Sequence, residues 1–299
     1  MICTEIYNGQ GLGNQLWVYA VTYAAARRAG VPLGLARTDK FKAHDILKLK
    51  YDIEAVGGEG PEGGPPTKLP DGIDHYLAER KVNHPTWNCE IGKGDPRFFN
   101  VADRTKIDGY MQSEDYIIDF KDELTQILKP NEKFVRKELQ DQNVCVINFR
   151  GTAEYWTQPH VFLKPDYWYA AIKHVIDIDP TTKFFVVTDD VKVAQMYFPN
   201  LQCFHGTIAE DYGLIYSAKK LIVSNSTFAW FPAWTSPHNE LIIAPKYWAR
   251  HNISDGFWCV GDSLTRGWNY VDREGKLWDY ESCKKEKDEF ERLNSHLWR

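Results

Sequence analysis

The chain has 299 residues, a length that accommodates one large or two medium-sized domains. Its 43% hydrophobic and 26% charged residues are typical of a globular protein, and its net charge of −5 excludes the basic surface expected of a protein that binds nucleic acid or an anionic membrane. No apolar run approaches the ~20 residues that span a bilayer, and the amino terminus lacks a signal-peptide pattern, so we expect a soluble, cytoplasmic protein without a transmembrane segment.

The amino-terminal segment combines a β-type run over residues 2–7, a glycine-rich turn, and a helical pattern over residues 16–28 that Gly30 ends. The turn and the residues after it read NGQGLGNQL over residues 8–16. Its glycine spacing differs from the G-x-G-x-x-G of dinucleotide-binding proteins. We expect the free N–H groups at the start of the helix to bind an anion or a sugar hydroxyl.

The middle of the chain is less regular. Residues 56–66 read VGGEGPEGGPP, a composition that predicts a mobile loop without regular structure. The loop is either a flap beside a substrate site or a solvated linker. The six cysteines are dispersed without a C-x-x-C pair, which favours free thiols in a reducing compartment.

Beyond residue 140 apolar strands alternate with helices. The predicted strands are 144–149, 183–187, 221–223 and 241–243, and the predicted helices are 165–178, 191–197, 208–218 and 227–234. This alternation predicts a parallel sheet covered by helices on both faces. Ligands of such sheets bind beyond the carboxyl ends of the strands.

Polar residues follow three successive strands of this predicted sheet. The groups are Arg150 with Glu154, then Asp189 with Asp190, and then Ser224, Ser226 and Thr227. An arginine matches phosphate oxygens, a carboxylate accepts from ring N–H groups or ribose hydroxyls, and a helix start with hydroxyl side chains binds anions. Each group also has an ordinary structural explanation as an ion pair or a helix cap, so the functional interpretation depends on their occurrence together.

Two long blocks resemble the bacterial-type α1,2-fucosyltransferases. Residues 8–20 resemble the family's G-x-G-L-G-N-Q-[LM]-x-x-Y-A block, and residues 224–234, SNSTFAWFPAW, resemble its S-x-S-T-F-S-W-W-x-A-x-L block. The resemblance implies an α/β fold of GT-B type with two Rossmann-like domains and parallel sheets. It also implies an acceptor-side domain over residues 1–140, a nucleotide-sugar donor domain over residues 141–299, and metal-independent transfer with inversion.

The resemblance assigns site residues in both domains. The acceptor side comprises Gly11, Gly13, Asn14 and Gln15. The donor-binding residues are Asn148, Arg150, Asp189, Asp190, Ser224, Ser226, Thr227 and Phe228. No cofactor is implied beyond the GDP-sugar, which is a co-substrate.

The block around Arg150 departs from the family's H-x-R-R-x-D-Y. One register places Asn148 on the histidine and Gly151 on the second arginine, and an alternative register loses the first arginine instead. Either way the histidine and one arginine are missing. The histidine contacts guanine in relatives, so its absence here leaves the identity of the nucleotide open. Asp189 and Asp190 match the family's Asp-bearing strand end, and GDP is therefore the favoured nucleotide.

Sugar transfer develops negative charge on the leaving diphosphate, which Arg150 and the helix start at residues 226–228 are suited to stabilise. We expect no metal site, since the D-x-D at residues 177–179 lies at a helix end where solvated carboxylates are common. Glu154, four residues beyond Arg150, is the candidate general base and also fits an exposed loop carboxylate.

The sequence therefore predicts a glycosyltransferase that transfers fucose from GDP-fucose to a saccharide acceptor. Two alternatives remain open. The enzyme uses another nucleotide-sugar on the same fold, or the chain is a catalytically inactive carbohydrate-binding relative.

Overall fold

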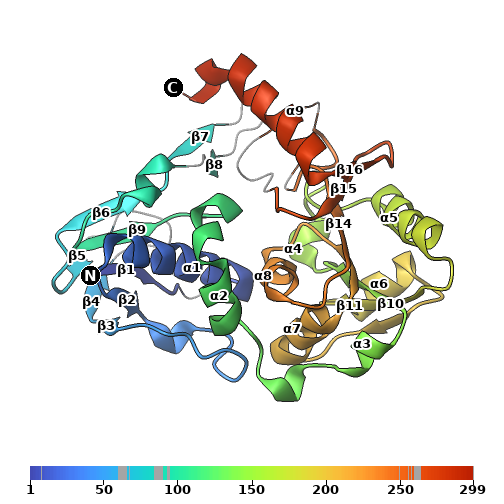
Figure 1. The fold of residues 1–299 in the computed structure, drawn as a ribbon, viewed down its shortest axis with the longest axis horizontal. Helices are drawn as coiled ribbons and strands as arrows, with labels where there is room; N and C mark the ends of the chain where they lie inside the picture. The colour runs from blue at the N-terminus through green and yellow to red at the C-terminus, as the bar shows by residue number, and fades with distance from the viewer. Residues whose placement is uncertain are drawn as a thin grey trace. The chain divides into compact units, whose positions relative to one another are not determined.

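The computed structural model describes residues 1–7, 9–59, 66, 68–83, 90–92, 95–248, 250–254, 256, 258 and 264–298 (Figure 1). The chain forms two compact units that divide after Leu128. Unit 1 comprises Met1–Leu128, and unit 2 comprises most of the remaining residues. Each unit contains a parallel sheet with helices packed on it, which confirms the predicted α/β fold with two Rossmann-like domains.

Unit 1 is built on a sheet of five strands in the order β3-β2-β1-β9-β6, all parallel. Its strands are β1 (Ile2–Glu5), β2 (Leu33–Ala36), β3 (Ile53–Ala55), β6 (His75–Ala78) and β9 (Thr105–Asp108). Helix α1 (Leu12–Ala29) packs on β1 and β2 (Figure 1). The order means that the chain crosses back over β1 between β3 and β6.

Helix α1 begins four residues earlier than predicted, at Leu12, and ends where predicted. Gly30 has a left-handed φ of 65°, and the Val31 N–H donates to the Ala26 carbonyl at 3.1 Å, as in a glycine-terminated helix. Of the three glycines in the preceding turn, Gly9 alone has a positive φ, 91°. The tight turn therefore depends on Gly9.

The glycine-rich segment predicted to lack regular structure contains a short strand, and the prediction is wrong for residues 57–59. Strand β4 (Gly57–Glu59) pairs antiparallel with β5 (Lys68–Pro70). Gly57 and Gly58 have φ of 79° and 93°, a conformation in which glycine pairs without strain. Residues 60–65 of the predicted loop lie outside the described residues.

The remaining elements of unit 1 are short. They are β7 (Lys81–Asn83) paired with β8 (Glu90–Gly92), η1 (Thr38–Lys40), η2 (Pro96–Phe99), η3 (Glu114–Tyr116), η4 (Ile118–Phe120) and α2 (Lys121–Ile127).

Unit 2 is built on a seven-stranded sheet in the order β12-β11-β10-β13-β14-β15-β16, parallel except for the last pair. Its strands are β10 (Val144–Phe149), β11 (Lys183–Thr188), β12 (Gln202–Phe204), β13 (Lys220–Val223), β14 (Leu241–Pro245), β15 (Asn269–Val271) and β16 (Leu277–Asp279). The four strands predicted in this region are confirmed to within two residues at each end. Strands β12, β15 and β16 were not predicted.

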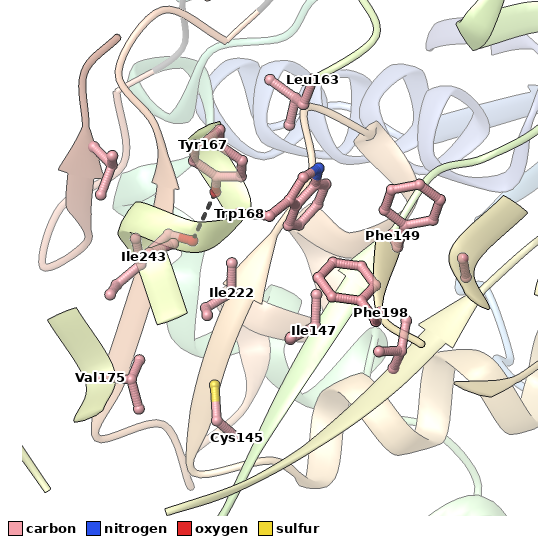
Figure 2. Close-up of a cluster of buried hydrophobic side chains, with 14 residues drawn as sticks. Cys145, Ile147, Phe149, Leu163, Tyr167, Trp168, Val175, Phe198, Ile222 and Ile243 are labelled. Atoms are coloured by element: carbon pink, nitrogen blue, oxygen red, sulfur yellow. Dashed lines mark hydrogen bonds between the residues drawn. The ribbon is translucent and has the colours of Figure 1, made fainter. Parts of the chain in front are cut away.

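Helices cover the unit 2 sheet on both faces, as predicted. The helices are α3 (Glu138–Asp141), α4 (Ala153–Trp156), α5 (Pro165–Ile178), α6 (Val191–Tyr197), α7 (Ile208–Ser217), α8 (Thr227–Thr235) and α9 (Tyr280–Leu293), and the chain continues into η6 (Ser295–Trp298). Side chains of α5 and α6 pack with alternate residues of β10 in one hydrophobic core (Figure 2). Helices α7 and α8 contact the same sheet through residues outside that core.

Residues 129–140, which we assigned to the amino-terminal domain, pack on unit 2. Segment η5 (Glu132–Phe134) contacts α7, and the Arg136 N–H donates to Ser217 Oγ at 2.8 Å. A side chain at Gly213 would meet the Phe134 carbonyl oxygen at 2.1 Å, so a glycine is needed for this close approach.

The four cysteines in the described part of the chain, Cys3, Cys145, Cys203 and Cys283, are free thiols. None of the helices described here is long and apolar enough to cross a membrane.

Tyr167 joins helix α5 to the centre of the unit 2 sheet. Its hydroxyl donates to the Val223 carbonyl at 2.6 Å and lies 3.4 Å from the Ile243 carbonyl (Figure 2). We expect Tyr167→Phe to lower the free energy of unfolding by about 1 to 2 kcal/mol, because the buried hydrogen bond is lost.

Urea unfolding curves measure this difference. Tyr169→Phe on the same helix is the matched control, since Tyr169 is 58% exposed, and its expected effect is within about 0.5 kcal/mol. Equal losses in the two variants would contradict the role given to the Tyr167 hydroxyl.

Candidate functional site

Each sheet has one point at which the order of strands reverses. In unit 1 the chain runs from β1 through β2 to β3 on one side and places β9 and β6 on the other, so the reversal lies between β1 and β9. In unit 2 it lies between β10 and β13. Ligands of open parallel sheets bind at such points, beyond the carboxyl ends of the strands. Both groups of predicted site residues lie near these two positions.

At the unit 2 reversal, Arg150 and Asp189 follow neighbouring strands and bind each other. Arg150 Nη1 lies 2.6 Å from Asp189 Oδ2, and the Gly151 N–H donates to Asp189 Oδ1 at 2.7 Å. The guanidinium also lies 5.1 Å from the centre of the Tyr155 ring. Asp189 and Tyr155 thus orient the guanidinium of Arg150, whose side chain is 30% exposed.

The neighbouring polar residues cap helices. Asp190 precedes α6 and accepts a hydrogen bond from the Val193 N–H at 3.1 Å. Ser226 precedes α8 and accepts from the Phe228 N–H at 3.3 Å. Thr227 forms the first residue of α8. The start of α8, with its partial positive charge, therefore faces the same edge of the sheet as Arg150.

Buried amide side chains lie at the carboxyl ends of the paired strands β10 and β13. Asn148 is inside β10, and its Oδ1 accepts from the Ser224 hydroxyl at 2.8 Å. Asn225, which the sequence analysis did not select, donates through Nδ2 to the Val161 carbonyl at 2.8 Å. Its buried Oδ1 accepts no hydrogen bond from the described residues. A buried acceptor without a donor is costly unless a ligand satisfies it.

Glu154, the predicted base, belongs to the short helix α4, but its side chain lies outside the described part of the structure. Thr152, in the same loop, has a buried hydroxyl oxygen without a hydrogen-bond partner among the described residues. The loop after β10 therefore carries a second polar atom that a ligand could satisfy.

Unit 1 contains a cavity of about 240 Å³ at the carboxyl edge of its sheet. Its polar lining consists of amide, tyrosine and carboxyl side chains: Gln10, Asn14, Gln112, Tyr76, Tyr110, Glu79 and Asp108. The described residues that line it include no lysine or arginine. Amides, carboxylates and aromatic rings without cations suit a neutral polyhydroxyl ligand better than a phosphate.

The floor of this cavity is a buried network of charged and phenolic groups. Asp108 Oδ2 accepts from the hydroxyls of Tyr7 and Tyr76, at 3.0 and 3.1 Å. Lys106, on the same strand, donates to Tyr7 at 3.1 Å and to Glu5 Oε2 at 2.7 Å. Burial raises the pKa of Asp108, and the hydrogen bonds and Lys106 oppose this rise.

Glu79 follows β6 and is only 4% exposed. Its Oε2 accepts from the Met111 N–H at 2.8 Å, and its Oε1 accepts from the Tyr116 hydroxyl at 3.3 Å. Burial raises the pKa of Glu79 to about 7. The cavity thus contains a carboxyl group that titrates near neutral pH.

The four residues predicted on the acceptor side occupy different environments. Asn14 lines the cavity and accepts from Gln112 Nε2 at 3.3 Å. Gln15 is a fully buried residue of α1 and binds the backbone of Lys40 and Lys42. Gly11 caps α1 with open space around its Cα, and Gly13 is buried within the first turn.

Glu79, Asp108 and Tyr76 are cavity residues that the sequence analysis missed. They lie in or directly after two strands, His75–Ala78 and Thr105–Asp108, whose polar residues hide the β pattern. The available signal was the pair Asp108-Gly109, a carboxylate followed by a glycine at a strand end.

A second cavity, of about 260 Å³, lies in unit 2 beyond β14 and β15. Its lining includes Lys164, His251 and Arg273 and none of the predicted donor-binding residues. Burial lowers the pKa of His251 to about 4, so this imidazole is neutral at physiological pH.

Comparison with known proteins places the chain beside glycosyltransferases. It is 25% identical over 195 residues to the O-antigen biosynthesis glycosyltransferase WbnK of Escherichia coli, in an alignment that spans 60% of this chain and 64% of that protein. It is 24% identical over 277 residues to an alpha-1,2-colitosyltransferase of Escherichia coli, spanning 83% and 92% of the two chains. No protein-family model matches the chain.

Among solved structures, NodZ alpha-1,6-fucosyltransferase soaked with GDP-fucose superposes with a TM-score of 0.46 and 13% identity, covering 83% of this chain and 96% of that one. Both curated relatives are named as glycosyltransferases, which agrees with the predicted resemblance. The chain spans 64% of the length of the first relative and 92% of the length of the second.

Gly109 follows Asp108, and its φ of 149° and its missing side chain leave room for Glu79. A Cβ at this position would lie 2.4 Å from Glu79 Cβ. We expect Gly109→Ala to lower the free energy of unfolding by about 1 to 3 kcal/mol through overpacking and backbone strain.

Thermal unfolding of Gly109→Ala and of the control Gly11→Ala measures the effect. No atom lies within 4 Å of a Cβ built on Gly11, and its φ of −65° suits alanine, so the control should stay within about 0.5 kcal/mol of the wild type. A Gly109 variant as stable as the control would show that Glu79 moves aside freely.

Proposed function

We propose that this glycosyltransferase transfers a 6-deoxyhexose from a GDP-linked donor to a hydroxyl group of a saccharide acceptor. The sequence favours fucose. Colitose, which is fucose without its 3-hydroxyl group, is the second sugar, because one relative is named an alpha-1,2-colitosyltransferase. The other relative is named for O-antigen biosynthesis, so the acceptor that we propose is a glycan of that kind.

The observation that carries the proposal is the position of Arg150 at the reversal point of the unit 2 sheet. Asp189 and the Tyr155 ring hold its guanidinium, and the start of α8 lies at the same edge. A fixed cation and a helix start together stabilise the charge that develops on a leaving diphosphate. The buried acceptor Asn225 Oδ1 offers a partner for a ribose hydroxyl or a base N–H.

We place the acceptor in the unit 1 cavity. Its amide, tyrosine and carboxyl lining matches the hydroxyl groups and the apolar faces of a sugar ring. The division of ligands between the units follows from charge, since the cation lies in unit 2 and the two carboxyl groups line the cavity of unit 1.

Several parts of the proposal come from the sequence. Inversion, a metal-independent reaction and Glu154 as the general base are predictions from the family resemblance. Guanine recognition by Asp189 or Asp190 is also a prediction, and in this structure Asp189 binds Arg150 and Gly151 while Asp190 caps α6. Binding of guanine through either carboxylate requires these local bonds to be exchanged or shared.

Nucleotide selectivity tests the donor. We expect GDP to raise the melting temperature in the presence of a chelator, because a ligand that binds only the folded state stabilises it by about 2.7 kcal/mol at ~100 times its dissociation constant. UDP and CDP should leave the melting temperature unchanged, since a site built for one base rejects another strongly. An equal shift with UDP would remove the GDP assignment.

Substitution of Arg150 tests the phosphate site. Arg150→Ala should weaken GDP binding by about 10- to 100-fold, because it removes a charge-assisted contact worth ~1.5 to 3 kcal/mol. Arg150→Lys should restore part of the affinity, since an ammonium lacks the planar two-pronged geometry.

Isothermal titration with GDP provides the dissociation constants. Arg292→Ala is the control, because Arg292 pairs with Glu289 on the exposed helix α9. Wild-type affinity in Arg150→Ala would place the diphosphate elsewhere.

A further inference from the structure

The two carboxyl groups of the unit 1 cavity have different surroundings. Asp108 accepts three hydrogen bonds, from Tyr7, Tyr76 and the Gly109 N–H, and Lys106 lies two residues before it on the same face of β9. These donors and this cation favour the carboxylate form. Burial nevertheless raises the pKa of Asp108 above its ordinary value. Because its oxygens already accept three hydrogen bonds, Asp108 is suited to orient a bound hydroxyl group.

Glu79 is held in place from three sides. The Met111 N–H binds Oε2, the Tyr116 hydroxyl binds Oε1, and the Gly109 backbone packs against the side chain. Met111 has a left-handed φ of 52°, an uncommon conformation for a residue with a side chain. Such local strain is found where a structure fixes a functional group.

Glu79 forms no direct ion pair with the described residues. The groups that act on it are Asp95, which is paired with Arg97, and Tyr116 on η3. Asp108 on β9 lines the same cavity. Burial and the negative charge of Asp95 raise the pKa of Glu79 to about 7. A buried carboxyl group in a cavity whose pKa is raised toward neutral pH is a recurrent feature of acid–base sites.

We propose that Glu79 is the catalytic residue that accepts the proton of the attacking acceptor hydroxyl, an inference that rests on the proposed function. The hydroxyl oxygen forms the new bond to the sugar C1 as its proton passes to the Glu79 carboxylate. The bond between C1 and the diphosphate oxygen breaks, and its electron pair leaves with GDP. The proton then returns to solvent.

This role differs from the one that the sequence suggested for Glu154. Glu79 lies in the cavity that holds the proposed acceptor, so the hydroxyl and the base belong to the same unit. A base that belongs to the same unit as the bound acceptor keeps its position relative to the acceptor hydroxyl, whichever donor is bound.

The test compares the wild type with Glu79→Gln, Glu79→Asp and the control Glu54→Gln. Glu54 is an exposed carboxylate on β3, at the opposite edge of the same sheet. Transfer from GDP-fucose is followed with lactose and N-acetyllactosamine as acceptor probes, and GDP affinity is measured by titration. We expect Glu79→Gln to lower kcat by ~10² to 10⁴-fold with unchanged GDP affinity, while Glu54→Gln retains the wild-type rate.

The dependence of kcat/KM on pH separates catalysis from structure. In the wild type kcat/KM should fall by about tenfold per pH unit below a pH of about 7, where Glu79 becomes protonated. Glu79→Asp should keep this acid limb at a lower rate, and Glu79→Gln should lose it.

Each result decides one point. A Glu79→Gln enzyme as fast as the wild type overturns the role of Glu79 and leaves the proposed function standing. A slow variant with the wild-type acid limb also overturns that role, because it indicates a structural effect. A wild-type enzyme that binds no GDP and transfers sugar only from another nucleotide overturns the proposed donor, and the same pH comparison with that donor then decides the role of Glu79.

Discussion

Parallel strand pairing is the constraint on which the rest of this structure depends. Strands buried on both faces must be apolar along their length, so polar side chains are displaced to the ends. Because all carboxyl ends of a parallel sheet lie at one edge, residues far apart in the chain meet there. Arg150 and Asp189 meet in unit 2 in this way, and Glu79 and Asp108 meet in unit 1. Two buried polar side chains inside strands, those of Lys106 and Asn148, each bind a partner on a neighbouring element.

The two edges are electrically different, although they arise from the same architecture. The unit 2 edge presents a guanidinium and the start of a helix, and both favour negative charge. The unit 1 cavity presents two carboxyl groups, amides and phenols, which favour hydroxyl groups. A sugar-transfer enzyme needs both environments, because its donor carries a diphosphate and its acceptor is a neutral alcohol.

How well the sequence predicts the strands of each unit depends on whether local patterns or residues far away in the chain specify them. The four predicted strands of unit 2 are apolar, and two of them are followed by the capping residues Asp190 and Ser226, so local patterns were sufficient to place them. Strand β9 of unit 1 reads TKID, and its lysine is accommodated in the interior only because Glu5, 101 residues away in the chain, accepts from it. Periodicity does not detect such a distant pair. The same limit applied to Asp189, which was predicted from its strand end although its pairing with Arg150 depends on the sheet.

The unit 1 cavity combines a buried floor, whose residues cannot be substituted without a loss of stability, with lining residues that are free to vary in evolution. Lys106 binds Glu5 directly and is joined to Asp108 through the Tyr7 hydroxyl. Loss of Glu5 would leave the buried ammonium of Lys106 without its carboxylate partner, at a cost of several kcal/mol. Asn14 and Gln112 line the same cavity from a helix start and a loop. If the cavity binds the acceptor as proposed, exchange of these amides alters the hydroxyl groups that it accepts while the scaffold beneath stays intact. Under that proposal, single substitutions would be enough to change the glycan that is made, without a new fold.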